Sequence, residues 1–213
     1  GSFHVYDKDS STQLWSYSTS GGSATSVSIS ADGEYIAGGD GYGKLRLWDK
    51  DSSTPSWTFT IQGSDIKSVD LSADGEYIAM GSINDMVYLF DKDSSTPSWS
   101  YSTSGNVNSV SISEDGQYVT AASSSNKVYF FDKDSGTPLW SYSLSSNDFT
   151  AVSISADGKH IIAGSDDDKA YKFTTIWDPG LMFGSSGHLY DDNSPLIERL
   201  SIKSEISNFS PFT

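Results

Sequence analysis

Pairs of aspartates two residues apart recur along the chain and could bind a cation. The segment Asp-Lys-Asp-Ser begins at residues 7, 49, 91 and 132. Carboxylates at alternate positions open an EF-hand calcium loop, which also needs a third oxygen ligand, a glycine at its sixth position and a distant glutamate. These segments lack that set. We therefore predict that Asp49, Asp91 and Asp132 cap turns by accepting hydrogen bonds from backbone N–H groups, with cation binding as the alternative.

The other polar motifs point to no catalytic or metal site. Asp166, Asp167 and Asp168 are adjacent and predict a solvated turn, with weak binding of a divalent ion as the alternative. The three histidines have no metal-ligand spacing. The chain has no cysteine, no Gly-x-Ser-x-Gly nucleophile motif and no glycine-rich phosphate loop. We therefore predict no catalytic residue, no metal and no cofactor.

Charge and hydropathy exclude several classes of partner. The 213 residues include 13 Lys and Arg against 28 Asp and Glu, a net charge of −15. Binding to nucleic acid or to anionic lipid needs clustered cations, so neither is expected. No apolar run approaches the roughly 20 residues of a membrane span, so membrane insertion is not expected either.

Two landmarks recur with one period and determine the fold prediction. The Asp-Lys-Asp segments start 42, 42 and 41 residues apart. An Asp-Gly turn recurs with spacings of 42, 41 and 42 residues, at Asp32-Gly33, Asp74-Gly75, Asp115-Gly116 and Asp157-Gly158. Asp-Gly favours a hairpin turn because glycine tolerates a positive φ angle. Two independent landmarks with a shared period indicate internal duplication.

Each repeat predicts four short β-strands. In the second unit, residues 56–60 and 68–72 alternate apolar and polar side chains, and residues 77–80 and 86–90 are nearly continuous apolar runs. The complete units span residues 14–49, 56–91, 98–132 and 139–173. A large anchor opens the first strand of each unit, at Trp15, Trp57, Trp99 and Trp140. His160 takes the place of a tyrosine in the other units, so we expect it to pack.

A single sheet of about 40 residues is too small to bury its faces alone. Sheets stacked around an axis cover each other, and a period near 42 with four strands is typical of β-propeller blades. We predict an all-β fold with four blades in residues 14–173. Residues 1–13 hold the last strand of an incomplete or shared blade, and residues 174–213 form a degenerate fifth blade or a tail. Both a closed five-blade ring and a piece of a longer propeller fit this pattern.

Two families share these motifs. Residues 26–39, followed by Lys44-Leu45-Arg46-Leu47-Trp48-Asp49, resemble the WD-repeat family, although later units replace the Trp-Asp pair by Phe-Asp. The segment 132–140 resembles the tryptophan-docking motif of pyrroloquinoline-quinone-type propellers, through Gly136, Thr137 and Trp140. Both resemblances imply a propeller. The second implies either quinone-dependent dehydrogenases or non-catalytic assembly proteins.

The function that we predict is that of a non-enzymatic propeller acting as a protein-interaction scaffold or surface-protein module. Its partner is a protein, and its net charge would steer basic surfaces toward it. Alternatives are a fragment of a quinone-dependent dehydrogenase and a lectin-like module whose sugar-stacking surface is formed by the pairs Trp15/Tyr17, Trp99/Tyr101 and Trp140/Tyr142. An unclosed stack would leave apolar sheet faces bare and is expected to form a homo-oligomer through them. The serine-rich, acidic, cysteine-free composition favours the cell surface or the exterior.

Overall fold

The computed structural model describes residues 1–175, 190–191 and 194–195, and every regular element in them is a β-strand. The all-β fold predicted from the repeat is confirmed. Within this part of the chain, no helix is long and apolar enough to cross a membrane. The predicted fifth blade or tail, residues 174–213, lies almost wholly outside the described residues.

Consecutive strands pair antiparallel and form separate sheets. The first sheet has two strands, β1 (Ser2–Tyr6) and β2 (Gln13–Ser18). The second has four, β3 (Ala24–Ile29), β4 (Tyr35–Asp40), β5 (Lys44–Asp49) and β6 (Trp57–Thr60). The third has β7 (Ile66–Leu71), β8 (Tyr77–Ser82), β9 (Met86–Asp91) and β10 (Trp99–Ser102).

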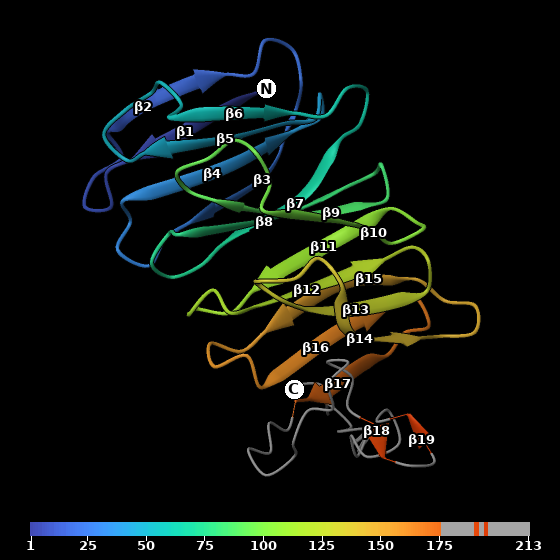
Figure 1. The fold of residues 1–213 in the computed structure, drawn as a ribbon. Coiled ribbons are helices and arrows are strands. Elements are labelled where there is room, and N and C mark those ends of the chain that lie inside the picture. The colour runs from blue at the N-terminus through green and yellow to red at the C-terminus, as the bar shows by residue number, and fades with distance from the viewer. Residues whose placement is uncertain (176–189, 192–193, 196–213) are drawn as a thin grey trace, which may run out of the picture.

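The fourth sheet contains β11 (Val107–Ile112), β12 (Tyr118–Ser123), β13 (Lys127–Asp132) and β14 (Pro138–Ser143). The fifth has three strands, β15 (Phe149–Ile154), β16 (His160–Ser165) and β17 (Ala170–Thr174). A short pair, β18 (Tyr190–Asp191) and β19 (Ser194–Pro195), follows. In Figure 1 the first five sheets form a stack, with β1 and β2 at the top and β17 near the bottom.

The sheets are offset by one strand from the units predicted from the sequence. Each tryptophan strand was expected to open a unit, but it closes the sheet before it. Trp57 pairs with Leu47 across β6 and β5, and Trp99 pairs with Leu89 across β10 and β9. The cause is the loop after each Asp-Lys-Asp segment, which turns the chain back beside the strand that it has just left. The intervals 14–49, 56–91, 98–132 and 139–173 therefore mark the sequence period and not the sheets.

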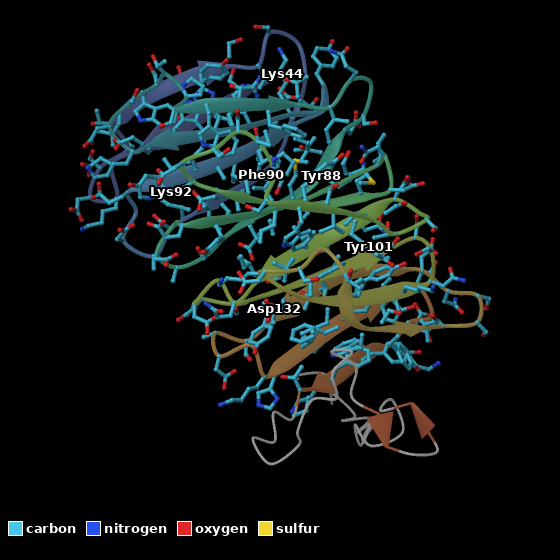
Figure 2. All side chains as sticks on the ribbon, viewed as in Figure 1. Lys44, Tyr88, Phe90, Lys92, Tyr101 and Asp132 are labelled. Carbon is cyan, nitrogen blue, oxygen red and sulfur yellow. The ribbon has the colours of Figure 1, made fainter. Side chains whose placement is uncertain are left out.

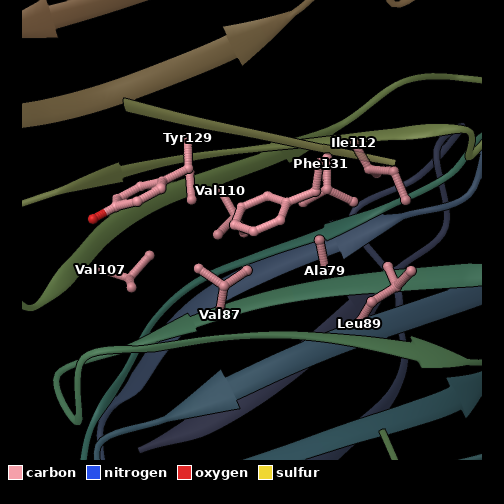
Figure 3. Close-up of a cluster of buried hydrophobic side chains, with 10 residues drawn as sticks. Ala79, Val87, Leu89, Val107, Val110, Ile112, Tyr129 and Phe131 are labelled. Atoms are coloured by element: carbon pink, nitrogen blue, oxygen red, sulfur yellow. The ribbon is translucent and has the colours of Figure 1, made fainter. Parts of the chain in front are cut away.

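The core lies between neighbouring sheets. One cluster joins Ala79, Val87 and Leu89 of the third sheet to Val110 and Phe131 of the fourth, all at most 4% exposed. Figure 3 shows these two groups of side chains pointing toward one another. Successive residues of a strand point their side chains alternately toward the two neighbouring sheets. Apolar side chains on both faces of a sheet therefore pack against both of its neighbours. This arrangement is the blade packing of a propeller.

The two ends of the stack differ from its interior. Val27 and Ile29 of β3 are 64% and 59% exposed. The first sheet has only two strands among the described residues and covers only part of the second. At the other end Ile162 is 53% exposed. His160, expected to pack, is also exposed, because no described sheet follows the one to which it belongs.

The Asp-Gly turns have one conformation in all four copies. Gly33, Gly75, Gly116 and Gly158 have φ angles between 69° and 78°, the left-handed region that glycine tolerates. In the second sheet Asp32 Oδ1 accepts hydrogen bonds from the Ser30 hydroxyl at 2.6 Å and from the Glu34 N–H at 3.0 Å. Asp74, Asp115 and Asp157 accept the same two bonds in the sheets that follow.

Candidate functional site

The Asp-Lys-Asp segments form tight turns between the last two strands of a sheet. Asp49 Oδ1 accepts the N–H of Asp51 at 3.0 Å, so the first aspartate closes an Asx turn. The same bond forms at Asp7, Asp91 and Asp132. The first carboxylate of each segment therefore accepts a hydrogen bond that closes its turn. The second carboxylate points into solvent, where the lysine between them contacts it, as Lys133 contacts Asp134 at 2.5 Å.

These loops and the Asp-Gly turns lie at the same end of every sheet. The N–H of Lys50 donates to the carbonyl of Glu34 at 2.8 Å, and the N–H of Lys92 donates to that of Glu76 at 2.9 Å. In Figure 2 the labelled Lys92 and Asp132, from two of these loops, both lie toward the left of the stack. We call this end of the stack, formed by the four Asp-Lys-Asp loops and the four Asp-Gly turns, the acidic end.

More than half of the acidic side chains of the protein gather at the acidic end. Counting only the residues that the structure describes, this end carries fifteen of the protein's 28 acidic residues but five of its 13 Lys and Arg. The acids are Asp7, Asp9, Asp32, Glu34, Asp49, Asp51, Asp74, Glu76, Asp91, Asp93, Glu114, Asp115, Asp132, Asp134 and Asp157, and the cations are Lys8, Lys50, Lys92, Lys133 and Lys159. Like charges side by side create a negative potential over this surface.

Local hydrogen bonds favour the ionised forms of Asp32, Asp157 and Lys92. The Ser155 hydroxyl and the Lys159 N–H lower the pKa of Asp157 to about 2. The Ser30 hydroxyl and the Glu34 N–H lower the pKa of Asp32 in the same way. The Glu76 carboxylate, 3.0 Å from the Lys92 amine, raises the pKa of that lysine.

The tryptophans dock each sheet onto the next one. Trp15, Trp57 and Trp99 donate their indole N–H to the carbonyls of Lys50, Lys92 and Lys133, at 2.6, 2.7 and 2.8 Å. Each bond joins two neighbouring sheets. The ring of Trp140 also packs on the next sheet, with its centroid 5.4 Å from that of Phe173. The four tryptophans thus pack in the last strand of a sheet against the sheet that follows.

The aromatic pairs proposed as a sugar platform lie in the core between sheets. Trp99 and Tyr101 both contact Phe131 of the next sheet, at centroid distances of 5.1 and 5.3 Å. Rings that pack on a neighbouring sheet do not present a common face to a ligand. The geometry therefore favours the alternative weighed from the sequence, that these rings belong to the blade core.

One buried ion pair was not foreseen from the sequence. Arg46 Nη1 lies 2.9 Å from Asp40 Oδ2, and the two side chains are 2% and 0% exposed. The other contacts of this pair stay within the stack, since Asp40 Oδ1 caps the turn to Lys44 and the Arg46 guanidinium lies 5.0 Å from the Tyr17 ring centre. The sequence did contain a signal for this ion pair, because the other units have an uncharged serine and tyrosine at these two positions.

The adjacent aspartates 166–168 form a turn. The Tyr171 hydroxyl donates to Asp167 Oδ2 at 2.5 Å, which raises the pKa of Tyr171 to about 12, and Lys169 contacts the same oxygen at 3.0 Å. Among residues 1–175 and the two short described segments, no three His, Cys, Asp or Glu side chains are grouped so as to hold a metal ion.

Comparison with known families agrees with the fold. A sequence model of the PQQ_2 family, described as outer membrane protein assembly factor BamB, matches residues 1–159. A comparison with curated protein sequences gives no match. The matched region includes the Asp-Lys-Asp loops and all four tryptophans. The chain therefore belongs to the PQQ_2 family of β-propeller-repeat proteins.

Proposed function

We propose that the protein is a non-enzymatic interaction module whose acidic end binds a basic surface of a protein partner. The observation that carries this proposal is the gathering of fifteen acids on turns fixed by backbone hydrogen bonds. A negative surface of this kind accelerates the encounter with a positively charged partner and selects against acidic ones. The family description, that of an assembly factor, is also in keeping with a role in protein contacts.

The same geometry supports a role without catalysis. The repeated carboxylates already accept hydrogen bonds that close turns, and each of the two motifs recurs in four sheets, whereas a catalytic site needs a single arrangement. Asp40, the carboxylate of the buried ion pair, is 0% exposed and is held by Arg46. Adding pyrroloquinoline quinone with Ca²⁺ is expected to leave the melting temperature unchanged. A shift, or new visible absorbance, would contradict the non-enzymatic proposal.

Binding to the acidic end can be tested with charge reversals matched between the two ends of the sheets. The variant Asp51→Lys/Asp93→Lys/Asp134→Lys changes side chains that are 76% to 81% exposed. The control Asp65→Lys/Asp85→Lys/Asp148→Lys makes the same change of net charge in loops at the opposite end of the sheets. The probe is a synthetic lysine-rich peptide, and its affinity is measured by fluorescence anisotropy at several salt concentrations.

We expect the first variant to weaken binding at least tenfold and the control to weaken it much less. We also expect the affinity of the unmodified protein to fall as salt rises, because the contact is between exposed charges. Equal losses in the two variants would show that net charge alone, and not the acidic end, attracts the peptide, and would overturn the proposal.

A further inference from the structure

Three junctions of the stack can be compared bond by bond, because similar repeats form them. They join the second sheet to the third, the third to the fourth and the fourth to the fifth (Figure 1). At each junction the first strands of two sheets lie side by side, as β3 and β7, β7 and β11, and β11 and β15 do. A bond that two junctions have and the third lacks therefore shows where the stack is held least firmly.

Serine hydroxyls join the second sheet to the third. Ser26 Oγ accepts the N–H of Val69 at 2.9 Å, and Ser28 Oγ accepts the N–H of Leu71 at 3.1 Å. Strand β7 is an edge strand of its sheet, so these two bonds satisfy backbone groups on its unpaired side.

At the junction of the third and fourth sheets an aspartate replaces one of the two serines. Ser68 Oγ accepts the N–H of Val110 at 3.0 Å, and Asp70 Oδ2 accepts the N–H of Ile112 at 3.0 Å. Asp70 Oδ1 also accepts the Ser28 hydroxyl at 3.1 Å. The carboxylate therefore strengthens the junctions on both sides of the third sheet.

The fourth and fifth sheets lack one of these two bonds. Ser109 Oγ accepts the N–H of Val152 at 3.2 Å. Ser111 occupies the position that accepts a second N–H at the other junctions, but its hydroxyl donates to Asp70 Oδ2 at 3.1 Å. Within the described residues no bond joins Ser111 to the N–H of Ile154. A hydrogen bond to a carboxylate is stronger than one between neutral groups, so Asp70 holds Ser111 on the side of the third sheet.

The Asp-Gly turns form a third bond at every junction. The N–H of Ala31 donates to the carbonyl of Ala73 at 2.8 Å, that of Ala73 to Glu114 at 2.9 Å, and that of Glu114 to Ala156 at 3.1 Å. All three junctions have this bond, and it is longest between the fourth and fifth sheets.

The tryptophan bond is a further difference between the junctions. Trp57 donates to the carbonyl of the residue 35 positions further on, and the corresponding residue for Trp140 is Thr175. Among the described residues no bond joins the Trp140 indole to that carbonyl. Asn108 offsets one of the two losses, because its Nδ2 donates to the Phe149 carbonyl at 2.8 Å.

Apolar packing does not compensate for the other loss. The cluster between the fourth and fifth sheets contains eight buried residues among those described, whereas the clusters at the third–fourth and second–third junctions contain ten and nine. Hydrogen bonds and apolar burial thus single out the same junction as the weakest of the three.

We propose that the stack opens reversibly between its fourth and fifth sheets, and that Asp70 sets this place by holding Ser111 away from the fifth sheet. Opening of this kind is a local equilibrium within a chain that stays folded elsewhere. It takes place between the first strands of the sheets and is independent of the binding proposed for the acidic end.

Hydrogen exchange at matched backbone amides, measured by NMR on the full chain, tests this proposal. The amides of Val69, Val110 and Val152 have the same residue type, and each donates across one of the three junctions. The loss of one ordinary hydrogen bond corresponds to about a fivefold change in an opening equilibrium. We therefore expect a protection factor at Val152 at least fivefold below those at Val69 and Val110. Equal protection at the three valines, or greater protection at Val152, would overturn the proposal.

Two matched serine variants test the bonds themselves. Ser28→Ala removes the acceptor of the Leu71 N–H, so protection at Val69 should fall about fivefold. Ser111→Ala makes the same change at the corresponding position, where the hydroxyl does not contact the fifth sheet, and should leave protection at Val152 unchanged. A fall at Val152 equal to that at Val69 would show that Ser111 does hold the fifth sheet, and would overturn the proposal.

The role of Asp70 is tested by Asp70→Ser, which gives the third sheet the residue that the second has at this position. Without the carboxylate, Ser111 is free to accept the Ile154 N–H, and protection at Val152 should rise. The control Asp65→Ser makes the same change of charge in the loop before the same strand and should leave Val152 unchanged. Unchanged protection in a folded Asp70→Ser variant would overturn the role of Asp70. If that variant does not fold, the comparison of the three valines in the unmodified protein still decides whether this junction opens first.

Discussion

Removing one charge of the buried Asp40–Arg46 pair should destabilise the protein far more than replacing the whole pair. The other repeats supply the replacement, since Ser82 and Ser123 stand where Asp40 does, and tyrosines stand where Arg46 does. The informative variants are therefore Asp40→Ser, Arg46→Tyr and the double variant. The three together form a double-mutant cycle.

The expected magnitude follows from burial. Arg46 and Asp40 are 2% and 0% exposed and lie 2.9 Å apart. Asp40→Ser leaves a guanidinium without its carboxylate in a site closed to water, which costs about 3–5 kcal/mol. Replacing a buried pair by neutral groups of similar size is often neutral or stabilising. In the fourth sheet the Tyr129 hydroxyl donates to the Thr103 carbonyl at 2.8 Å, and a tyrosine at 46 has the Thr19 carbonyl at the corresponding place.

The assay is equilibrium unfolding in guanidinium chloride, followed by tryptophan fluorescence. Trp48 and Trp15, with ring centres 5.9 Å apart, report on this part of the stack. We expect Asp40→Ser to lower the free energy of unfolding by about 3–5 kcal/mol, and Arg46→Tyr to restore about 2 kcal/mol or more of that loss. A loss below about 1 kcal/mol for Asp40→Ser, or strictly additive losses in the double variant, would refute the reasoning.

Three further predictions concern the turns and the anchors. Gly116→Ala and Gly33→Ala share the cost of placing alanine at a positive φ angle, about 1–2 kcal/mol. Only Gly116→Ala also crowds the Tyr77 ring, so thermal denaturation should show this variant to be the less stable by about 1–3 kcal/mol. Equal melting temperatures would contradict the tyrosine contact. Trp99→Phe keeps an aromatic ring but loses the hydrogen bond from the indole N–H to the Lys133 carbonyl of the next sheet. Urea denaturation should show that the free energy of unfolding falls by about 1–2 kcal/mol. Asp157 has its pKa lowered by folding to about 2, so its ionised form favours the folded state above the unfolded pKa near 3.9. The stability difference between the unmodified protein and Asp157→Asn should therefore be constant above about pH 5 and shrink as pH falls toward 2, and a difference that grows on acidification would show the sign to be wrong.

The sequence carried most of the information about the strands and little about their grouping. Alternation within residues 68–72 and the Asp-Gly turn after them identify a hairpin, because both signals are local. The strand of Trp57 could pair with the strand before it or with the one after it, and the period of 42 is the same in either case. Only the packing of the whole sheet decides this, and it placed Trp57 beside Leu47.

The candidate site was predictable to a similar extent. The turn-capping role of Asp49 follows from local chemistry, so spacing was enough to suggest it. The gathering of carboxylates at one end depends on strand direction, because the Asp-Gly turn and the Asp-Lys-Asp loop lie at one end only if the two strands between them are antiparallel. The exposure of Val27 had no local signal at all, since it depends on how many strands the preceding sheet contains.

The hydrogen bonds from Ala31 to Ala73 to Glu114 to Ala156 have a consequence for how such a chain can change in length. Each sheet meets only the sheet on either side of it, and the bonding groups offered to the two sides recur at every step. Inserting one more unit of about 42 residues would add one junction of the same kind and leave the existing ones intact. Gene duplication can therefore lengthen this protein in whole steps, whereas a partial unit would leave a sheet with strands missing.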